Sequence, residues 1–430
     1  YMAAMRLDIP SMIVTGGSMQ PGQYCGKTVV EADLDAARFS GASEEELMDM
    51  EDNVCPSFGA CPSMGTANTM QMLGEVLNLV LPGTSTIPAS DNAKLRKARE
   101  AGMYMVEMAK AGRKPSDLIT KEVLMNAIMF DMAVAGSTNA VLHILSYAYE
   151  LGIKLTLEDF EKYAEEIPCI NAVVPSGPYT VVDFHYAGGV MNVMKMLESK
   201  LYTNVPSMYG NTWADMLSKV KAQENKVIHS LEKPLFHEPG LKILRGNLSP
   251  NGAIVRPTAV YDEVKYMKGK AKVFEGDRPA FEAIMAGEIV PGDIIVIRYE
   301  GCKGAPGMKE LMLSIDALIG LGLDKSVGLI SDARFSGFNY GAIIGHVSPE
   351  AYDGGNIALV ENGDEIVIDI PNGEVSMLVS EEELERRRAA WVCPPLKEEK
   401  GCLNIFAKMC RPAEEGGAMQ PWDLNAKFKR

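Results

Sequence analysis

The sequence predicts a mixed α/β protein with two domains: an α/β/α first domain built on a parallel sheet, and a β-barrel-like second domain. In the first half, helical periodicity alternates with short apolar segments, which is typical of strands separated by helices. After Pro239 and Gly240 the chain changes to short apolar runs separated by Gly, Asp and Asn, which indicates a barrel. The segment LEKPLFHEPG between the halves is rich in proline and charge, so we expect domains at residues 1–235 and 241–430.

Length and composition narrow the class of protein. The 430 residues suffice for a large core and two domains, and 47% of them are hydrophobic. The net charge of −15 argues against a nucleic-acid partner, because phosphate binding needs a concentrated basic surface. The eight cysteines are too few for a disulfide scaffold, and no apolar run reaches the roughly 18 residues of a membrane helix. We therefore expect a cytoplasmic protein in a reducing compartment, with no membrane and no nucleic-acid partner.

The first half begins with SMIVTGG, residues 11–17, which predicts a strand that runs into a glycine turn. Apolar residues at three- and four-residue spacing then predict helices near residues 43–51, 64–80, 92–112, 121–134 and 137–151. Capping residues at the start of ASDNAKLRKARE and of TLEDFEKYAEEI support helix starts at both places.

The second half contains short runs rich in β-branched residues, each bounded by turn residues. We expect strands within LKILRGNL, AIVRPTAV, AKVFEG, GDIIVIRYEG, VGLISDARFSG, NIALVENGDEIVIDI and EVSMLVS. Runs of this length at short spacing favour a barrel over a single open sheet.

Cys61 lies in FGACPSMGTANTM, a segment of small residues that leads into a predicted helix. A helix that begins just after Cys61 directs backbone N–H groups and its positive dipole end toward the thiol, which lowers the pKa of that thiol. A thiolate there can bind iron, attack a substrate or enter a disulfide. The alternative is that Cys61 is a buried structural cysteine. For Cys55 less evidence opposes that same alternative.

The segment RYEGCKGAPGMKEL, residues 298–311, combines glycines with carboxylates. Its glycines allow the backbone to approach a ligand closely, and Glu300 and Glu310 are oxygen ligands suited to Mg²⁺. The alternative is a tight turn with solvated glutamates.

Two further segments carry candidate polar residues. In SDARFSG a predicted strand ends in a loop with Arg334 and Ser336; a serine without a nearby histidine needs a metal or a positive charge to become reactive, and is otherwise a turn residue. In AGSTNAVLH, the residues Ser137, Thr138 and Asn139 predict a helix cap, which is also a place to bind a carboxylate or phosphate.

In their order along the chain, these segments resemble one family, the IlvD/Edd dehydratases, which includes dihydroxy-acid dehydratase, phosphogluconate dehydratase and sugar-acid dehydratases. The resemblance runs from the first residue to about residue 420, over RLDIPSMIVTGGSMQPG, GACPSMGTANTM, AGSTNAVLH, AGGVMNVMKML, LRGNLSPNGAIV, YEGCKGAPGMKEL, SDARFSG and GHVSPEA. It implies an iron–sulfur and Mg²⁺-dependent hydro-lyase that converts a 2,3-dihydroxy carboxylic acid to a 2-keto acid. By this resemblance Cys61 is a cluster ligand, Glu310 a Mg²⁺ ligand and Ser336 the proton acceptor.

Several finer expectations accompany the resemblance. We expect a [2Fe–2S] rather than a [4Fe–4S] cluster, a homodimer or homotetramer, and the dihydroxy acid of branched-chain amino-acid synthesis as substrate, with an aldonate or phosphogluconate as the alternative. The family has two further cluster cysteines ahead of the position of Tyr1, one of them in a Cys-Asp-Lys motif, so we expect that this sequence lacks the N-terminal segment of such an enzyme. A metal-free thiol enzyme that uses Cys61 and an inactive interaction protein are alternatives from other classes.

Overall fold

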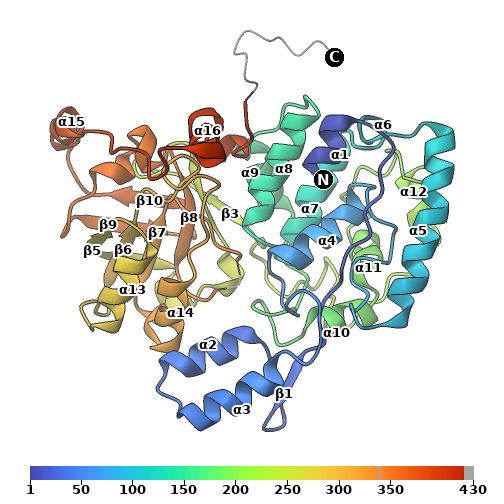
Figure 1. Cartoon of the computed structure of the whole chain (residues 1–430), viewed down its shortest axis with the longest axis horizontal. Coiled ribbons are helices and arrows are strands. Elements are labelled where there is room, and N and C mark those ends of the chain that lie inside the picture. Colours follow the sequence, from blue (N-terminus) through green and yellow to red (C-terminus); the bar gives the residue numbers. More distant parts are fainter. Residues whose placement is uncertain (338, 421–430) are drawn as a thin grey trace. The chain divides into compact units, whose positions relative to one another are not determined.

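The computed structural model describes residues 1–337 and 339–420, and the chain divides into two compact units (Figure 1). The first unit is Tyr1–Leu241 and the second begins at Lys242. The first is almost entirely helical, whereas the second is built on one eight-stranded sheet, so the mixed α/β class with a barrel-like second half is confirmed. Among the helices of the described residues, none combines the length and apolar character needed to cross a bilayer.

The first unit consists of helices and one antiparallel hairpin. The helices are α1 (Met2–Leu7), α2 (Glu31–Phe39), α3 (Glu44–Val54), α4 (Thr66–Val76), α5 (Asn92–Ala111), α6 (Pro115–Leu118), α7 (Lys121–Val134), α8 (Asn139–Glu150), α9 (Leu157–Glu166), α10 (Val181–Tyr186), α11 (Gly189–Met196) and α12 (Trp213–Leu217). The hairpin pairs β1 (Gly22–Tyr24) with β2 (Lys27–Val29). The five helices predicted from periodicity correspond to α3, α4, α5, α7 and α8.

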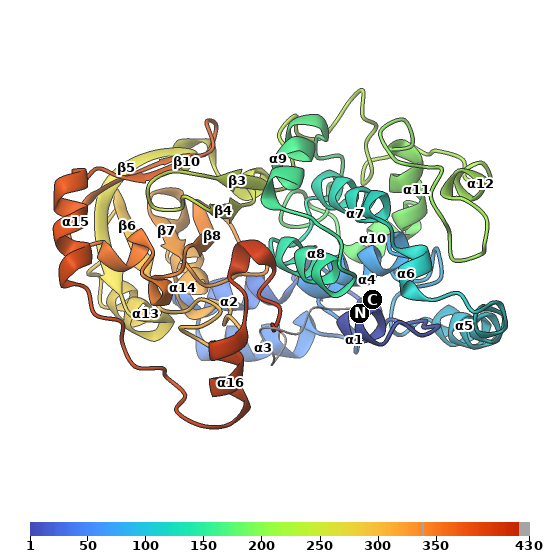
Figure 2. The ribbon, with the colours of Figure 1, turned by 90° about the horizontal axis from the view of Figure 1, so that it is seen from above.

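Helix α7 is the centre of the core of the first unit. Nearly every side chain from Val123 to Val134 is buried, so the helix has no solvent-facing stripe over this length. A helix that is apolar on all sides needs partners all round it. Figures 1 and 2 show α4, α8, α9 and α11 around α7, and each of the four contacts it.

Residues 11–17 do not form the predicted strand, and the described residues of the first unit contain no parallel sheet. The N–H of Ile13 donates to the carbonyl of Leu79 over 2.7 Å, and Ser18 forms an isolated bridge with Ala60. Such single contacts hold an extended segment against helices without the regular ladder that defines a sheet. The predicted parallel strands lie in the second unit instead.

The sheet of the second unit has the strand order β10-β9-β5-β6-β7-β8-β4-β3. The strands are β3 (Lys242–Leu244), β4 (Gly252–Val255), β5 (Tyr266–Phe274), β6 (Asp293–Ile297), β7 (Gly328–Ser331), β8 (Ile343–Ser348), β9 (Glu365–Asp369) and β10 (Glu374–Met377). Strands β5 to β8 run parallel to one another, and the remaining pairs are antiparallel. The predicted runs account for these strands except β8.

The sheet is nearly closed, because its two edge strands meet. The N–H of Arg245 donates to the carbonyl of Gly373, and the N–H of Val375 donates to the carbonyl of Arg245, both over 2.8 Å. These bonds join the end of β3 to the start of β10, so few edge groups remain to pair with another chain.

Alternation along β6 shows the two faces of this sheet. Ile294 and Val296 belong to a cluster that takes residues from every strand and fills the inside of the barrel. Ile295 and Ile297 belong to a second cluster, formed with helices α13 (Asp277–Met285) and α14 (Leu313–Gly320). Because β6 is covered on both faces, its whole sequence is apolar after Asp293, as expected of a central parallel strand.

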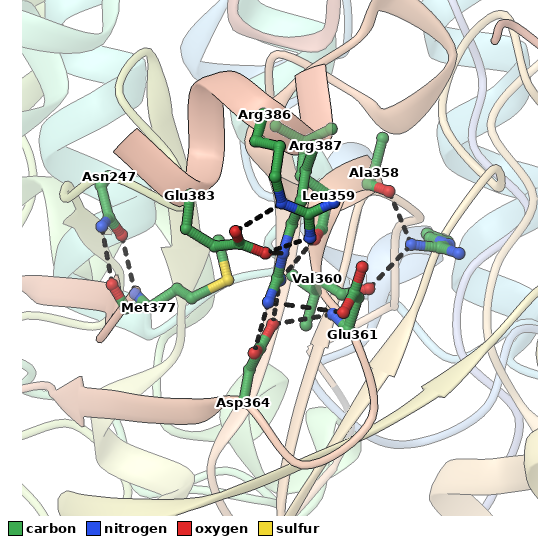
Figure 3. Close-up of polar contacts among 11 residues, drawn as sticks. Asn247, Ala358, Leu359, Val360, Glu361, Asp364, Met377, Glu383, Arg386 and Arg387 are labelled. Carbon is green, nitrogen blue, oxygen red and sulfur yellow. Dashed lines mark hydrogen bonds and ion pairs between the residues drawn. The ribbon is translucent and has the colours of Figure 1, made fainter. Parts of the chain in front are cut away.

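Two more helices follow β10, namely α15 (Glu381–Ala390) and α16 (Gly401–Met409). Arg387 anchors α15 to the unit (Figure 3). Its guanidinium donates to both carboxylate oxygens of Asp364, over 2.6 and 3.0 Å, and to the carbonyl of Leu359. It also donates to Glu383 on its own helix. A bidentate pair of this kind fixes the orientation of the helix as well as its position.

The segment LEKPLFHEPG packs along the first unit. The N–H of Cys169 donates to the carbonyl of Glu238, and the N–H of Phe236 donates back to Cys169. Gly240 lies so close to the backbone of Ala135 that a Cβ at this position would collide with it.

Candidate functional site

Cys61 lies in a loop that leads into α4. Gly65 is the N-cap of this helix and Thr66 its first residue. The side-chain amide of Asn68, in the first turn, donates to the carbonyls of Cys61 and Ser63. Asn68 therefore ties the backbone of the loop to the helix that follows it, and this restrains the position of the thiol.

The thiol of Cys61 is partly exposed, and its Sγ lies 3.3 Å from the Oγ of Ser63. Burial raises the pKa of Cys61; the bond to Ser63 lowers it, and the nearby Glu31 raises it again. The predicted fall in the pKa of this thiol is therefore wrong for the thiol by itself. The reason is that burial is the largest influence on this thiol and exceeds the lowering by the hydrogen bond to Ser63. A bound metal reverses this direction, because coordination deprotonates a thiol.

The start of α8 lies against the start of α4. The Oγ1 of Thr66 accepts a hydrogen bond from Nδ2 of Asn139 and lies 2.9 Å from the Oγ of Ser137. The N–H of Ser137 donates to the Oγ1 of Thr69 over 3.0 Å. The two helix starts are thus joined by hydrogen bonds among Thr66, Thr69, Ser137 and Asn139.

The predicted cap of α8 is confirmed in part. The helix starts at Asn139, and the Oγ of Ser137 accepts from the N–H of Asn139. The formal N-cap residue is Thr138, which makes no side-chain capping bond. Ser137, Thr138 and Asn139 therefore form the start of α8 together, and Ser137 supplies the capping side chain.

Sequence reasoning missed Thr66, Asn68 and Thr69. All three lie in TANT, directly after the small residues that follow Cys61. Polar residues three apart in the first turn of a helix share one face, so Thr66 and Thr69 carried a usable signal. Asn68 carried none, because its bonds reach back to the preceding loop.

In the second unit, Glu310 and Arg334 lie side by side although they come from different loops. The N–H of Leu311 donates to the carbonyl of Arg334 over 2.9 Å, and the N–H of Arg334 donates to the carbonyl of Lys309 over 3.3 Å. Glu310 and Arg334 are partners in this short parallel bridge. The Nη1 of Arg334 lies 3.8 Å from Oε1 of Glu310. The exposed fractions of the two side chains are 26% for Arg334 and 30% for Glu310.

Ser336 follows in the same loop and is partly buried. On one side of it, Phe335 is buried against Gly345, where a Cβ would collide with the phenyl ring. On the other side, the buried guanidinium of Arg256 donates to the carbonyl of Gly337 over 2.6 Å. Both neighbours of Ser336 are therefore held by packing or hydrogen bonding, which fixes the backbone that carries its hydroxyl.

A pocket of about 330 Å³ opens beside Arg334. Half of its lining residues are charged and half are apolar or glycine: Glu300, Ala305, Pro306, Gly307, Met308, Lys309, Arg334, Lys397, Glu398 and Leu403. Within it, the ammonium group of Lys397 lies 2.9 Å from Oε1 of the buried Glu300. Glu300 is buried and closely paired, whereas the side chain of Glu310 is 30% exposed and lies farther from its cation, 3.8 Å from Arg334, so Glu310 is the better candidate for a cation ligand.

Each unit thus contains one group of the predicted site residues. These are Cys61, Ser137, Thr138 and Asn139 in the first unit, and Glu310, Arg334 and Ser336 in the second.

The donors present suit the expected cofactors in kind but not in number. A thiol such as that of Cys61 is the usual ligand of an iron–sulfur cluster, and a carboxylate such as Glu310 is the usual ligand of Mg²⁺. Across residues 1–337 and 339–420, however, no group of three or more His, Cys, Asp or Glu side chains is placed to hold a metal ion. The described residues therefore do not complete either ligand set.

Comparison with known proteins gives a consistent result for both units. Residues 1–216 match the family described as dihydroxy-acid/6-phosphogluconate dehydratase N-terminal, and residues 226–417 match its C-terminal counterpart. Proteins named dihydroxy-acid dehydratase from Methanococcus aeolicus and Clostridium novyi are 41% and 42% identical over 428 and 430 residues. These matches cover 97% of this chain and 77% of each relative. A protein of the same name from Methanosarcina barkeri is 44% identical over 424 residues, which cover 97% of this chain and 76% of the relative. The chain therefore belongs to the dihydroxy-acid/6-phosphogluconate dehydratase family.

Proposed function

We propose that the protein is a hydro-lyase that removes water from a 2,3-dihydroxy carboxylic acid and forms a 2-keto acid, as a dihydroxy-acid dehydratase of branched-chain amino-acid synthesis. The observation that carries the proposal is the similarity over nearly the whole chain to proteins of that name. The side-by-side placement of Glu310 and Arg334, with Ser336 in the same loop, supports it.

In this proposal, Ser336 accepts the proton from C2 of the substrate. The reaction needs the C2 proton and the C3 hydroxyl to leave, and the enol that forms then tautomerises to the ketone. Arg334 and the polar side chains of Ser137, Thr138 and Asn139 are proposed to bind oxygen atoms of the substrate, because a guanidinium suits a carboxylate and because hydroxyl and amide groups suit hydroxyls.

Cys61 is proposed as one ligand of an iron–sulfur cluster, of the [2Fe–2S] type, and Glu310 as one ligand of Mg²⁺. The chemistry that these groups supply when bound is Lewis acidity toward the C3 hydroxyl and toward the substituents of C2. One thiol and one carboxylate do not hold them, so the proposal requires ligands beyond the described residues. A homodimeric or homotetrameric cytoplasmic enzyme is the form that we expect from the family.

A sugar-acid dehydratase is the second candidate, and the pocket beside Arg334 favours it. Lys309, Lys397 and Glu398 line this pocket, and such groups suit the hydroxyls or the phosphate of a sugar acid better than they suit an alkyl chain. A pocket that hydrogen-bonds those hydroxyls discriminates strongly against substrates that lack them.

The alternatives from other classes receive less support. A metal-free thiol enzyme needs a thiolate, whereas burial raises the pKa of Cys61. If the protein were an inactive interaction protein, the placement of Glu310 beside Arg334 would have no functional explanation.

The proposal is tested by the iron and sulfide content of full-length protein purified without air, compared with Cys61→Ser. We expect iron, sulfide and 2-keto acid formation in the natural protein and the loss of all three in the variant. Cys393→Ser is the control, because Cys393 is exposed and lies in the other unit. A fully active protein that contains neither iron nor sulfide contradicts the proposal.

A further inference from the structure

Two buried carboxyl groups lie where the loops of the parallel strands meet. Asp332 follows β7 directly, and Glu350 follows β8. Their exposed fractions are 1% and 4%. Because β6, β7 and β8 are parallel, the loops at their carboxyl ends gather at one edge of the sheet, where ligand sites are commonly found.

Asp332 joins three segments through backbone hydrogen bonds. Its Oδ2 accepts from the N–H groups of Tyr299 and Ala351, over 3.1 and 2.9 Å, and its Oδ1 accepts from the N–H of Glu300 over 3.0 Å. The bonds connect the loop after β6, the loop after β7 and the segment after β8. One carboxyl group thus sets the spacing between all three.

Glu350 holds the next part of the loop after β6. Its Oε1 accepts from the N–H groups of Lys303 and Gly304, over 2.9 and 3.1 Å. Gly301 makes this approach possible, since a Cβ there would collide with Oε2 of Glu350. The glycines of this loop therefore admit a protein carboxyl group to its backbone.

The same loop continues to Glu310 and is fastened a second time by Arg334. The Nε of Arg334 donates to the carbonyl of Met308, beside the bridge that places Glu310 next to Arg334. Asp332 lies two residues before Arg334 in the chain. Asp332 and Glu350 thus fasten the first part of the loop, and Arg334 fastens the part that carries Glu310.

We propose that Asp332 and Glu350 are positioning residues, which hold residues 299–304 so that Glu310, Arg334 and Ser336 keep their arrangement for the reaction. This inference depends on the function proposed above only for the roles given to Glu310, Arg334 and Ser336. Neither carboxyl group contacts the substrate in this role. Each acts through the backbone of the loop.

The surroundings of Glu350 make the attachment of residues 299–304 dependent on pH. Burial raises the pKa of Glu350 to about 8, with the negative charge of Asp332 as the next cause and Asp353 as a further one. The titratable groups that interact with Glu350 are Asp332, Asp353, Lys303, Tyr352, Cys302 and Cys410. A raised pKa means that the folded protein binds this proton more tightly than the open loop does. The closed arrangement of residues 299–304 is therefore most stable at acidic pH. Its stability falls as pH rises from 4.5, the ordinary pKa of a glutamate, to about 8, the pKa of Glu350, and stays constant above that.

The test is hydrogen exchange of the amides in residues 299–305, from pH 5 to pH 9, with rates corrected for the intrinsic effect of pH. We expect protection in the natural protein to fall about tenfold or more between pH 5 and pH 8. Glu350→Gln keeps an oxygen acceptor and loses the charge, so its protection should stay flat over this range. Asp293→Asn is the matched control, because Asp293 is also buried and accepts a backbone N–H, that of Val290, before β6. It should retain the pH dependence of the natural protein.

Turnover supplies the second measurement. The kcat/KM of Glu350→Gln should lose an alkaline fall that the natural protein and Asp293→Asn both show. Protection of residues 299–305 that is unaffected by Glu350→Gln at every pH overturns the proposal, and so does an altered loop with an unaltered rate profile. A natural protein that acts on no hydroxy acid contradicts the proposed function alone, because the exchange measurement needs no activity.

Discussion

At the scale of single residues, the candidate site depends on side chains that hold backbone in place. Asn68 ties the loop of Cys61 to α4, and Asp332 ties three loops together in the second unit. Both are buried and both bond to backbone groups, so their removal leaves unpaired polar groups in the interior.

Replacement of Asn68 by Asp should destabilise the loop of Cys61. Aspartate cannot donate as the amide does, so the carbonyls of Cys61 and Ser63 lose their shared donor and the protein loses about 1–3 kcal/mol of stability. Urea unfolding measures this loss. Asn53→Asp is the control, because the amide of Asn53 also donates to a carbonyl, that of Asp49, but on an exposed helix. Equal losses in both variants would contradict the role given to Asn68.

Replacement of Ser336 by Ala should lower kcat/KM by about 10²- to 10⁴-fold, because it removes the proposed proton acceptor. Steady-state rates of 2-keto acid formation measure the effect, and a thermal melt checks the fold. Ser326→Ala provides the comparison, since the hydroxyl of Ser326 bonds only weakly to the carbonyl of Leu323 ahead of β7. A drop of less than threefold in the Ser336 variant would refute the assigned role.

Some of the site was predictable from the sequence, and the limits have physical causes. Glycines and carboxylates in RYEGCKGAPGMKEL predict a place where backbone and ligand approach closely, yet the structure shows Glu350 at Gly301. The contact between Glu310 and Arg334 crosses two loops, and pairing over such a distance leaves no local pattern. The pKa of Cys61 depends on burial, which the helix-start argument does not contain.

At the scale of elements, the parallel strands place the loops and the helices cover the sheet. Helix α15 is a useful case, because its sequence EEELERRRAA has no apolar stripe to bind it to the unit. Leu384 is its one buried side chain. Its attachment therefore depends on the polar contacts of Arg387 that Figure 3 shows.

Replacement of Arg387 by Ala should destabilise the second unit by about 3 kcal/mol, because it leaves the nearly buried carboxylate of Asp364 without its partner. Urea unfolding followed by circular dichroism measures the change. Arg386→Ala should leave the stability nearly unchanged, since Arg386 is 65% exposed and pairs with Glu383 on the same helix. If both variants lose the same stability, the helix is held by something other than Arg387.

Element types were predicted where the local pattern is strong. The periodicity of α5 and α7 and the apolar runs of β6 and β7 are signals that tertiary contacts do not override. The segment SMIVTGG has the composition of a strand but finds no ladder partner, so it stays extended. Strand β8, with the sequence IIGHVS, was missed because Gly345 and His346 interrupt its apolar run.

At the scale of the whole molecule, the division into a helical unit and a barrel-like unit follows from the change along the chain from helical periodicity to short apolar runs. The assignment of the parallel strands to the first half was wrong, because periodicity shows that a strand is present but not which strand lies beside it. The net charge of −15 agrees with a small acidic substrate only if cationic side chains are concentrated at the site. Lys309, Arg334 and Lys397 line one pocket of the second unit together with Glu300 and Glu398, so cations exceed anions there by one.

The substrate is decided by initial rates on 2,3-dihydroxyisovalerate and on a panel of aldonates, measured with full-length protein prepared without air. We expect the matching 2-keto acid to form from 2,3-dihydroxyisovalerate at a kcat/KM at least tenfold above that for any aldonate. No 2-keto acid from any member of the panel, in a preparation that contains iron, sulfide and Mg²⁺, would contradict it.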